Sequence, residues 1–265
     1  VLGGCQGSTG PASPHPDDGR PYGSRFPVIT VRDMVRAQAR LADHLGVQRW
    51  HSVVGGSLGG MQVLQWAMTH PTELGRALIF AASSRLTAQN IAFSAVGRQA
   101  IMRDSHFLDG RFLIAGTSPR KGLSVARMMA HITYLSETGF EEKFGRTAQR
   151  GELAKNFGVD FAVESYLEHQ GERFLSRFDA LSYLYLTRVM DYFDPFGDPV
   201  HVQKQISQGE TSFLVLSFDS DWRFSTEHAR VLASELRGVG APVTFQEISS
   251  PHGHDSFLFP DPPEY

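Results

Sequence analysis

One short segment constrains this chain more than any other: residues 55–59 read GGSLG, with Ser57 at the centre. A strand-like run at 47–54 precedes this segment and a helix-like run at 61–68 follows it. Strand, Gly-x-Ser-x-Gly and helix, in that order, form a nucleophile elbow, a tight turn that lifts the serine above the edge of a sheet. The flanking glycines are expected because a Cβ would clash in so tight a turn. Taken alone, the same residues also fit a glycine-rich turn without chemistry.

Carboxylates and a histidine follow later strand-like segments in the order that such a serine needs. A serine hydroxyl is a weak nucleophile at neutral pH and depends on a histidine base held by a carboxylate. Asp219 and Asp221 follow the run 212–218, and His254 follows the run 242–248. Acid and base therefore lie beyond strand ends, where open α/β sheets bind ligands. The order Ser, Asp, His predicts a catalytic triad, although either aspartate could instead cap a helix.

The sequence around the histidine also allows a different interpretation. Residues 252–255 read HGHD, a combination that occurs in metal sites. No second group of ligands accompanies it in the sequence, so we expect no metal and no bound cofactor.

Two arginines are candidates for binding an anion. Arg127 lies within the otherwise apolar helical stretch 125–130, and a buried guanidinium needs an anionic partner. The alternative is an arginine whose stem follows the helix until its head reaches water. Arg223 stands two residues after Asp221, so it either lies near the same site or belongs to the surface.

The order of predicted elements indicates an α/β fold. Strands alternate with helices at both ends of the chain, which favours a parallel sheet covered on both faces. Thr30 with Asp33 three residues later is a capping box for a helix that Gly46 ends. The middle of the chain contains helix-like segments, including 122–135 and 178–192, and no clear strand. We therefore expect a core formed by 1–85 and 209–265, interrupted by a helical insertion at 86–208.

Composition restricts the class of protein. Hydrophobic residues make up 41% and charged residues 20% of the 265, as in globular proteins, and the net charge of −3 argues against nucleic-acid or anionic-membrane partners. Cys5 is the only cysteine, so no internal disulfide is possible. Apolar runs are too short to span a bilayer and no signal peptide is recognisable, which predicts a cytoplasmic protein. The chain begins with Val1 and lacks a terminal helix, so we expect truncation at both ends.

Taken together, the motifs resemble the homoserine O-acyltransferase family over essentially the whole chain. The segments that carry the resemblance are residues 2–11, 55–62 (GGSLGGMQ), 88–93 (AQNIAF), 130–136 (AHITYLS), 163–167 (VESYL) and 253–258 (GHDSFL). The resemblance implies an α/β-hydrolase fold with a helical lid. It also implies transfer of an acyl group from a coenzyme A thioester to an amino-acid hydroxyl through an acyl-serine, a step of methionine biosynthesis.

The resemblance also assigns roles to residues by matching motif. Ser57 matches the nucleophile, His254 the base, and Asp221 the acid, because the family's acid directly precedes a tryptophan. Arg127 and Asp255 match residues that hold the amino-acid substrate, which implies that Arg127 binds its carboxylate and Asp255 its ammonium. The backbone N–H of Leu58 is one expected oxyanion-hole donor. A second donor and several strands are expected upstream of Val1, so this stretch alone is expected to catalyse poorly.

Arg223 and its neighbours predict the identity of the acyl donor. Family members that resemble the segment 221–225 (DWRFS) tend to use succinyl donors, and a succinyl carboxylate would compensate the charge of this arginine. We therefore expect succinyl-CoA, with acetyl-CoA as the alternative donor. Other readings are an esterase or thioesterase on the same fold, or a non-catalytic binding module. The expected partners are small molecules, and the resemblance suggests a homodimer.

Overall fold

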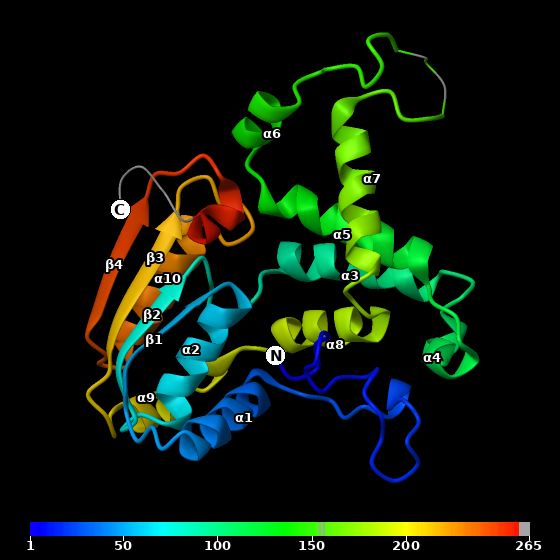
Figure 1. The fold of residues 1–265 in the computed structure, drawn as a ribbon. Helices are drawn as coiled ribbons and strands as arrows, with labels where there is room; N and C mark the ends of the chain where they lie inside the picture. Colours follow the sequence, from blue (N-terminus) through cyan, green and yellow to red (C-terminus); the bar gives the residue numbers. More distant parts are fainter. Residues whose placement is uncertain (154, 156, 260–265) are drawn as a thin grey trace. The chain divides into compact units, whose positions relative to one another are not determined.

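A computed structural model describes residues 1–153, 155 and 157–259, and groups the chain into two compact units (Figure 1). Val1–Val28 and Ala88–Arg188 form the first, which we call the helical unit. Ile29–Thr87 and Val189–Tyr265 form the second, which we call the sheet unit. Among the described residues, every helix is too short or too polar to span a lipid bilayer.

The sheet unit is built on four parallel strands in the order in which they occur in the chain. Parallel pairing brings the carboxyl ends of all strands to one edge, where Gly56, Phe80, Leu216 and Gln246 stand side by side. The predicted parallel sheet is therefore confirmed. The strands are β1 (Trp50–Gly56), β2 (Leu74–Phe80), β3 (Ser212–Phe218) and β4 (Val243–Ile248).

Helix α2 (Leu58–Thr69) packs on β1 and β2, and its apolar side chains are almost all buried. The predicted capping box begins the first helix: the Thr30 hydroxyl accepts a bond from the Asp33 N–H, and the Asp33 carboxylate accepts one from the Thr30 N–H. The other elements are α1 (Val31–His44), α9 (Pro199–Ile206), α10 (Thr226–Gly238), and the 3-10 helices η3 (Pro195–Gly197) and η4 (Gly253–Leu258).

The prediction that helices cover both faces of the sheet was wrong for the described residues. The crossovers β1–α2–β2 and β3–α10–β4 advance in the same direction across the sheet, and right-handed crossovers then place their helices on one face. Side chains on that face are buried, whereas Val54 on the other face is 56% exposed. The alternation of strands and helices in the sequence does not by itself fix which face each helix covers. The buried residues include Ala77, Ile79, Phe213 and Val215, and the half-exposed ones include Leu78, Phe80, Leu214 and Leu216.

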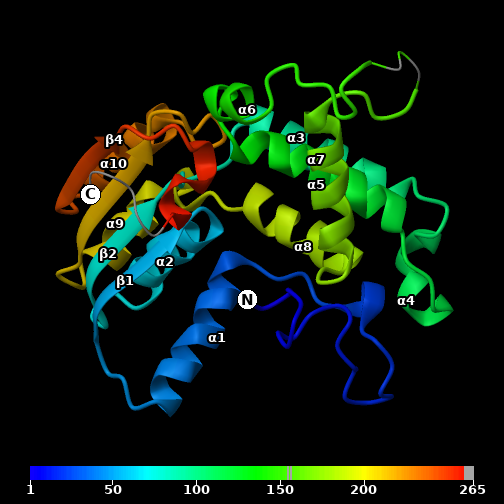
Figure 2. The same ribbon diagram turned by 45° about the horizontal axis from the view of Figure 1, so that its top comes forward.

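The helical unit consists of several helices (Figure 2). Their buried side chains form a shared apolar core. Among the described residues between β2 and β3 there is no strand, as predicted, and α5 and α8 match the two predicted helices. The elements are η1 (Gly23–Arg25), α3 (Ala88–Met102), η2 (Leu108–Gly110), α4 (Phe112–Ala115), α5 (Arg120–Tyr134), α6 (Glu137–Lys143), α7 (Ala162–Leu175) and α8 (Ala180–Asp191). The core includes Ile101, Phe112, Leu123, Ala126, Phe174 and Leu181.

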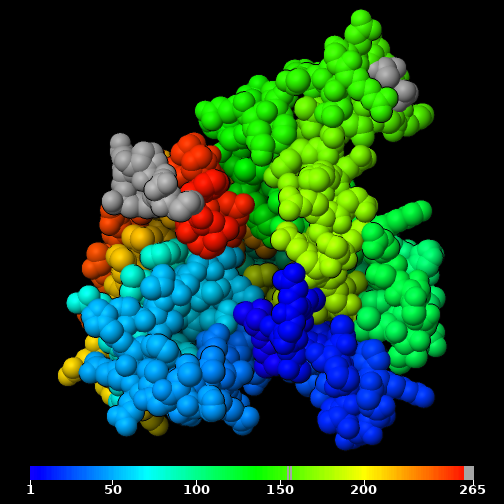
Figure 3. All heavy atoms as spheres, viewed as in Figure 1, coloured from blue at the N-terminus to red at the C-terminus, as the bar shows by residue number. Residues whose placement is uncertain are grey.

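The structural division differs from the sequence-based one at two places. The N-terminal segment (dark blue in Figure 3) groups with the helical unit rather than with the sheet. The Asp179 N–H donates to the Cys5 thiol at 3.1 Å, and the Tyr185 hydroxyl donates to the Phe26 carbonyl at 2.6 Å. Residues 189–208 belong to the sheet unit, because α9 packs against α2.

Candidate active site

Ser57 stands at the turn between β1 and α2, as the motif predicts. Its backbone has φ 57° and ψ −124°, a conformation that residues with a Cβ rarely adopt. Bonds from the Ser57 N–H to the Phe80 carbonyl at 3.0 Å and from the Met61 N–H to the Ser57 carbonyl at 3.2 Å hold the turn. Although Ser57 is the N-cap residue of α2, its hydroxyl turns to His254 rather than to the helix.

The glycines of the elbow differ in how much space a side chain would have. A Cβ on Gly55 would overlap the backbone of Gly59, so the strand and the helix could not approach each other. A Cβ on Gly60 would lie 2.7 Å from the Ala82 Cβ. At Gly59 itself a Cβ would meet only open space, so the expected clash does not explain that position.

Three side chains form a continuous hydrogen-bonded chain beyond the carboxyl ends of the strands. His254 Nε2 lies 2.9 Å from Ser57 Oγ, and His254 Nδ1 lies 2.7 Å from Asp221 Oδ2. The three residues come from the β1–α2 turn, the loop after β3 and the loop after β4. A serine hydroxyl, an imidazole and a carboxylate in this order can activate the hydroxyl as a nucleophile.

Asp221 is held on both oxygens and shielded from water. Its second oxygen, Oδ1, accepts bonds of 2.9 Å from the backbone N–H groups of Arg223 and Phe224. Asp221 is only 1% exposed and His254 4%. Rings of Phe224 and Phe257 flank the imidazole, with centroids 5.1 Å and 5.7 Å away. The acid is thus fixed in position before any substrate binds.

The structure assigns different roles to Asp219 and Asp221, which their spacing in the sequence does not distinguish. Asp219 accepts bonds from the Ser250 N–H at 3.0 Å and the Ser249 hydroxyl at 2.7 Å, tying the end of β3 to the loop after β4. Burial alone would raise the pKa of Asp219, but these bonds hold it below its usual value. Asp219 therefore supports the loop, and Asp221 alone contacts His254.

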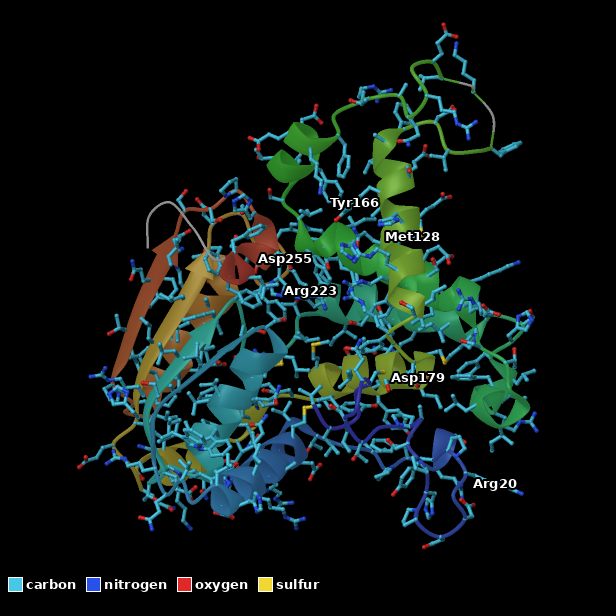
Figure 4. All side chains as sticks on the ribbon, in the orientation of Figure 1. Arg20, Met128, Tyr166, Asp179, Arg223 and Asp255 are labelled. Atoms are coloured by element: carbon cyan, nitrogen blue, oxygen red, sulfur yellow. The ribbon has the colours of Figure 1, made fainter. Side chains whose placement is uncertain are left out.

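The other predicted site residues of the sheet unit, Leu58, Arg223 and Asp255, are close in sequence to the hydrogen-bonded serine, aspartate and histidine. Leu58 is the first residue of α2, and an N–H in the first helical turn has no carbonyl within the helix to bond. Asp255 follows His254 within η4, and Arg223 follows Asp221; Figure 4 labels both. The Arg223 guanidinium lies 5.7 Å from the centre of the Phe224 ring.

Arg127 belongs to the helical unit, on α5. It neither extends freely into water nor forms an ion pair with a described carboxylate. Its guanidinium carbon lies 4.7 Å from the Phe174 ring centre and 5.4 Å from that of Tyr134. Its Nε is buried with no hydrogen-bond partner among the described residues. This arrangement leaves capacity to bind an anion.

No group of three or more His, Cys, Asp or Glu within the described parts of the chain is placed to hold a metal ion. His252, part of the segment that suggested one, instead packs its ring against Phe259 at 4.4 Å.

Several residues around these groups could not be assigned from the sequence. Phe224 and Phe257 stand inside quoted motifs, but a ring that flanks an imidazole leaves no recognisable spacing. His131 and Tyr166 also went unassigned. They lie 35 residues apart, and their contact depends on how α5 crosses α7.

The chain is similar in sequence to known proteins. Residues 2–261 match a family model described as the alpha/beta hydrolase fold. A homoserine O-succinyltransferase of Acidithiobacillus ferrooxidans is 52% identical over 98% of this chain and 69% of its own length. One from a Nocardioides species is 54% identical over 100% of this chain and 71% of its own length.

Solved structures resemble the chain in fold. A homoserine O-acetyltransferase from Bacillus anthracis superposes with a TM-score of 0.84 at 24% identity, covering 96% of this chain and 68% of that protein. The esterase E22 superposes with a TM-score of 0.82 at 22% identity, covering 94% and 68%. One fold thus accommodates both transferases and hydrolases, and the choice between these activities depends on individual side chains.

Proposed function

Because this chain belongs to the homoserine O-acyltransferase family of the α/β-hydrolase fold, we propose that it transfers a succinyl group from succinyl-CoA to the hydroxyl of L-homoserine. The observation that carries the proposal is the hydrogen-bonded chain Asp221–His254–Ser57. Its serine stands in a strained turn at the start of a helix, where negative charge is stabilised.

The first half of the reaction acylates the enzyme. His254 Nε2 takes the proton of Ser57 Oγ as the oxygen attacks the thioester carbon, and Asp221 stabilises the imidazolium. The N–H of Leu58 donates to the oxyanion of the tetrahedral intermediate. The carbon–sulfur bond then breaks, the coenzyme A sulfur takes the proton from His254, and the succinyl group stays on Ser57 as an ester.

The second half returns the enzyme to its first state. His254 takes the proton of the homoserine hydroxyl, whose oxygen attacks the ester carbonyl. The Ser57 oxygen leaves and regains its proton from His254. No metal or bound cofactor takes part in this proposal, and the coenzyme A thioester is a co-substrate. The suggested homodimer and cytoplasmic location belong to the same proposal, the dimer being testable by light scattering.

We assign the amino acid to Arg127 and Asp255. The buried, unpartnered Nε of Arg127 suits the homoserine carboxylate, and the Asp255 carboxylate suits its ammonium. Arg127→Leu and Asp255→Asn are each expected to raise the KM for homoserine at least about tenfold, since each removes a charge-assisted bond. Steady-state kinetics with homoserine varied at saturating succinyl-CoA would measure this. An unchanged KM in both variants would contradict the assignment.

We assign the donor preference to Arg223. The two relatives described above are named succinyltransferases, which supports this choice. A terminal carboxylate is the part of a succinyl group that an acetyl group lacks. Arg223→Leu is expected to lower kcat/KM for succinyl-CoA about tenfold to a hundredfold and to leave acetyl-CoA little changed. Arg32→Leu, which removes an exposed arginine from α1, is the control. Equal losses with both donors would argue against the assignment.

The proposal as a whole is tested by coenzyme A release from the full-length protein, offered succinyl-CoA or acetyl-CoA with and without L-homoserine. Release from succinyl-CoA that depends on homoserine is the expected result. Preference for acetyl-CoA would keep the triad and overturn the donor. Release indifferent to homoserine would favour a thioesterase, the activity that the structural similarity to an esterase keeps as the second candidate.

A further inference from the structure

A ladder of alternating cations and aromatic rings extends over α5, α6 and α7 within the helical unit. At one end, the Lys143 ammonium lies 4.6 Å from the centre of the Tyr166 ring, and the Tyr166 hydroxyl lies 3.4 Å from His131 Nδ1 (Tyr166 is labelled in Figure 4). At the other end, the guanidiniums of Arg127 and Arg177 lie 4.7 Å and 6.0 Å from the centre of one shared ring, that of Phe174.

The positive charge of this ladder is not neutralised locally. Arg127, Lys143 and Arg177 form no ion pair with any carboxylate that the structure describes. Glu172, a nearby acid on α7, pairs with Arg120 instead. Three cations gathered without counter-charges repel one another and attract an anion.

His131 lies among these cations and is itself neutral. It is 8% exposed, and burial, followed by the charges of Arg127, Arg177 and Lys143, lowers its pKa to about 4. When the Tyr166 hydroxyl donates to Nδ1, the proton of the neutral ring is on Nε2. Nε2 is buried and has no acceptor among the described residues. A buried donor without an acceptor is costly, and an anionic oxygen would satisfy it.

We propose that Lys143 and Arg177, with His131 between them, bind the phosphate groups of the coenzyme A portion of the acyl donor. This inference rests on the proposed function, which makes a coenzyme A thioester a substrate. In the proposed function the homoserine carboxylate binds to one of the three cations, Arg127. Lys143 and Arg177 then remain to bind another anion. Coenzyme A carries a diphosphate and a 3′-phosphate, which need several cations. The half-buried rings of Tyr166 and Phe144, whose centroids lie 4.8 Å apart, add aromatic surface that suits its adenine.

The test compares two succinyl thioesters, succinyl-CoA and succinyl-N-acetylcysteamine, which lacks the phosphates and adenosine. Lys143→Ala and Arg177→Ala are each expected to raise the KM for succinyl-CoA about tenfold, because each removes a charge-assisted contact. The KM for the truncated thioester, the KM for homoserine and kcat should not change. Lys121→Ala, which removes an exposed lysine from the first turn of α5, is the matched control. A loss of the same size with both thioesters, or with neither, would overturn the inference.

Direct binding separates this inference from the proposed function. Calorimetry with coenzyme A, dephospho-coenzyme A and pantetheine on full-length protein needs no turnover. Affinity for coenzyme A is expected to fall about tenfold in each variant and with added salt, and affinity for pantetheine should not respond. This result would hold even if homoserine-dependent transfer were absent. Equal affinity of wild-type protein for coenzyme A and pantetheine would show that the cations do not bind phosphate.

Discussion

Ser57→Ala is expected to abolish the covalent intermediate and to reduce transfer roughly 10⁴-fold to 10⁶-fold, the range seen when one residue of a triad is removed. Intact-mass spectrometry after mixing with succinyl-CoA should find one added succinyl group on the wild-type protein and none on the variant. Ser207→Ala, which alters an exposed serine after α9, should behave as wild type. A succinyl adduct retained by Ser57→Ala would exclude Ser57 as the nucleophile.

The same variant should remain folded, which makes its inactivity interpretable. The Ser57 hydroxyl does not cap α2, so alanine removes no bond that holds the helix. The backbone strain at φ 57° is also similar for alanine and serine, because both carry a Cβ. We therefore expect the midpoint of thermal unfolding to match that of wild type. A much lower unfolding midpoint would mean that the variant is inactive because it is unfolded.

Asp221→Asn is the second change with a large expected effect, a fall in kcat of about 10⁴-fold, as in other serine triads. The N–H groups of Arg223 and Phe224 already bond to Oδ1, so the asparagine oxygen takes that place. Its NH₂ then faces His254 Nδ1, which must become an acceptor. The imidazole proton moves to Nε2, and His254 can no longer take the proton of Ser57.

Asp219→Asn is the matched control for this prediction. It makes the same chemical change two residues away, but Asp219 bonds to Ser249 and Ser250 and not to His254. Transfer activity should stay close to wild type, with only a modest loss of stability. If both variants lost activity equally, the separation of roles between the two aspartates would be wrong. Steady-state rates and unfolding midpoints of both variants measure the two effects.

The part of the site that could be predicted from sequence is the part that short motifs encode. The elbow follows from five residues, and the parallel sheet follows from alternating strands and helices. The choice between Asp219 and Asp221 could not come from spacing, because both follow the same strand. It depends on the turn at 221–224, which directs one carboxylate to His254 and leaves the other at the loop.

The features that sequence analysis missed depend on how elements cross. Whether helices cover one face of the sheet or both is decided by the direction in which successive right-handed crossovers advance, and the order of elements along the chain does not give that direction. The contact of His131 with Tyr166 requires α5 and α7 to pack together. The grouping of residues 1–28 with the helical unit likewise arises from distant partners such as Asp179 and Tyr185.

The way Asp221 is anchored bears on how this family could diversify. The backbone N–H of residue 223 helps to hold the acid, while the side chain is the part that we propose determines the acyl donor. Any residue except proline supplies that N–H. Mutation could therefore exchange one donor for another without passing through an inactive ancestor. Donor selectivity depends on the side chain of residue 223, whereas the position of Asp221 depends on the backbone N–H of the same residue. The side chain can therefore change without displacing the acid.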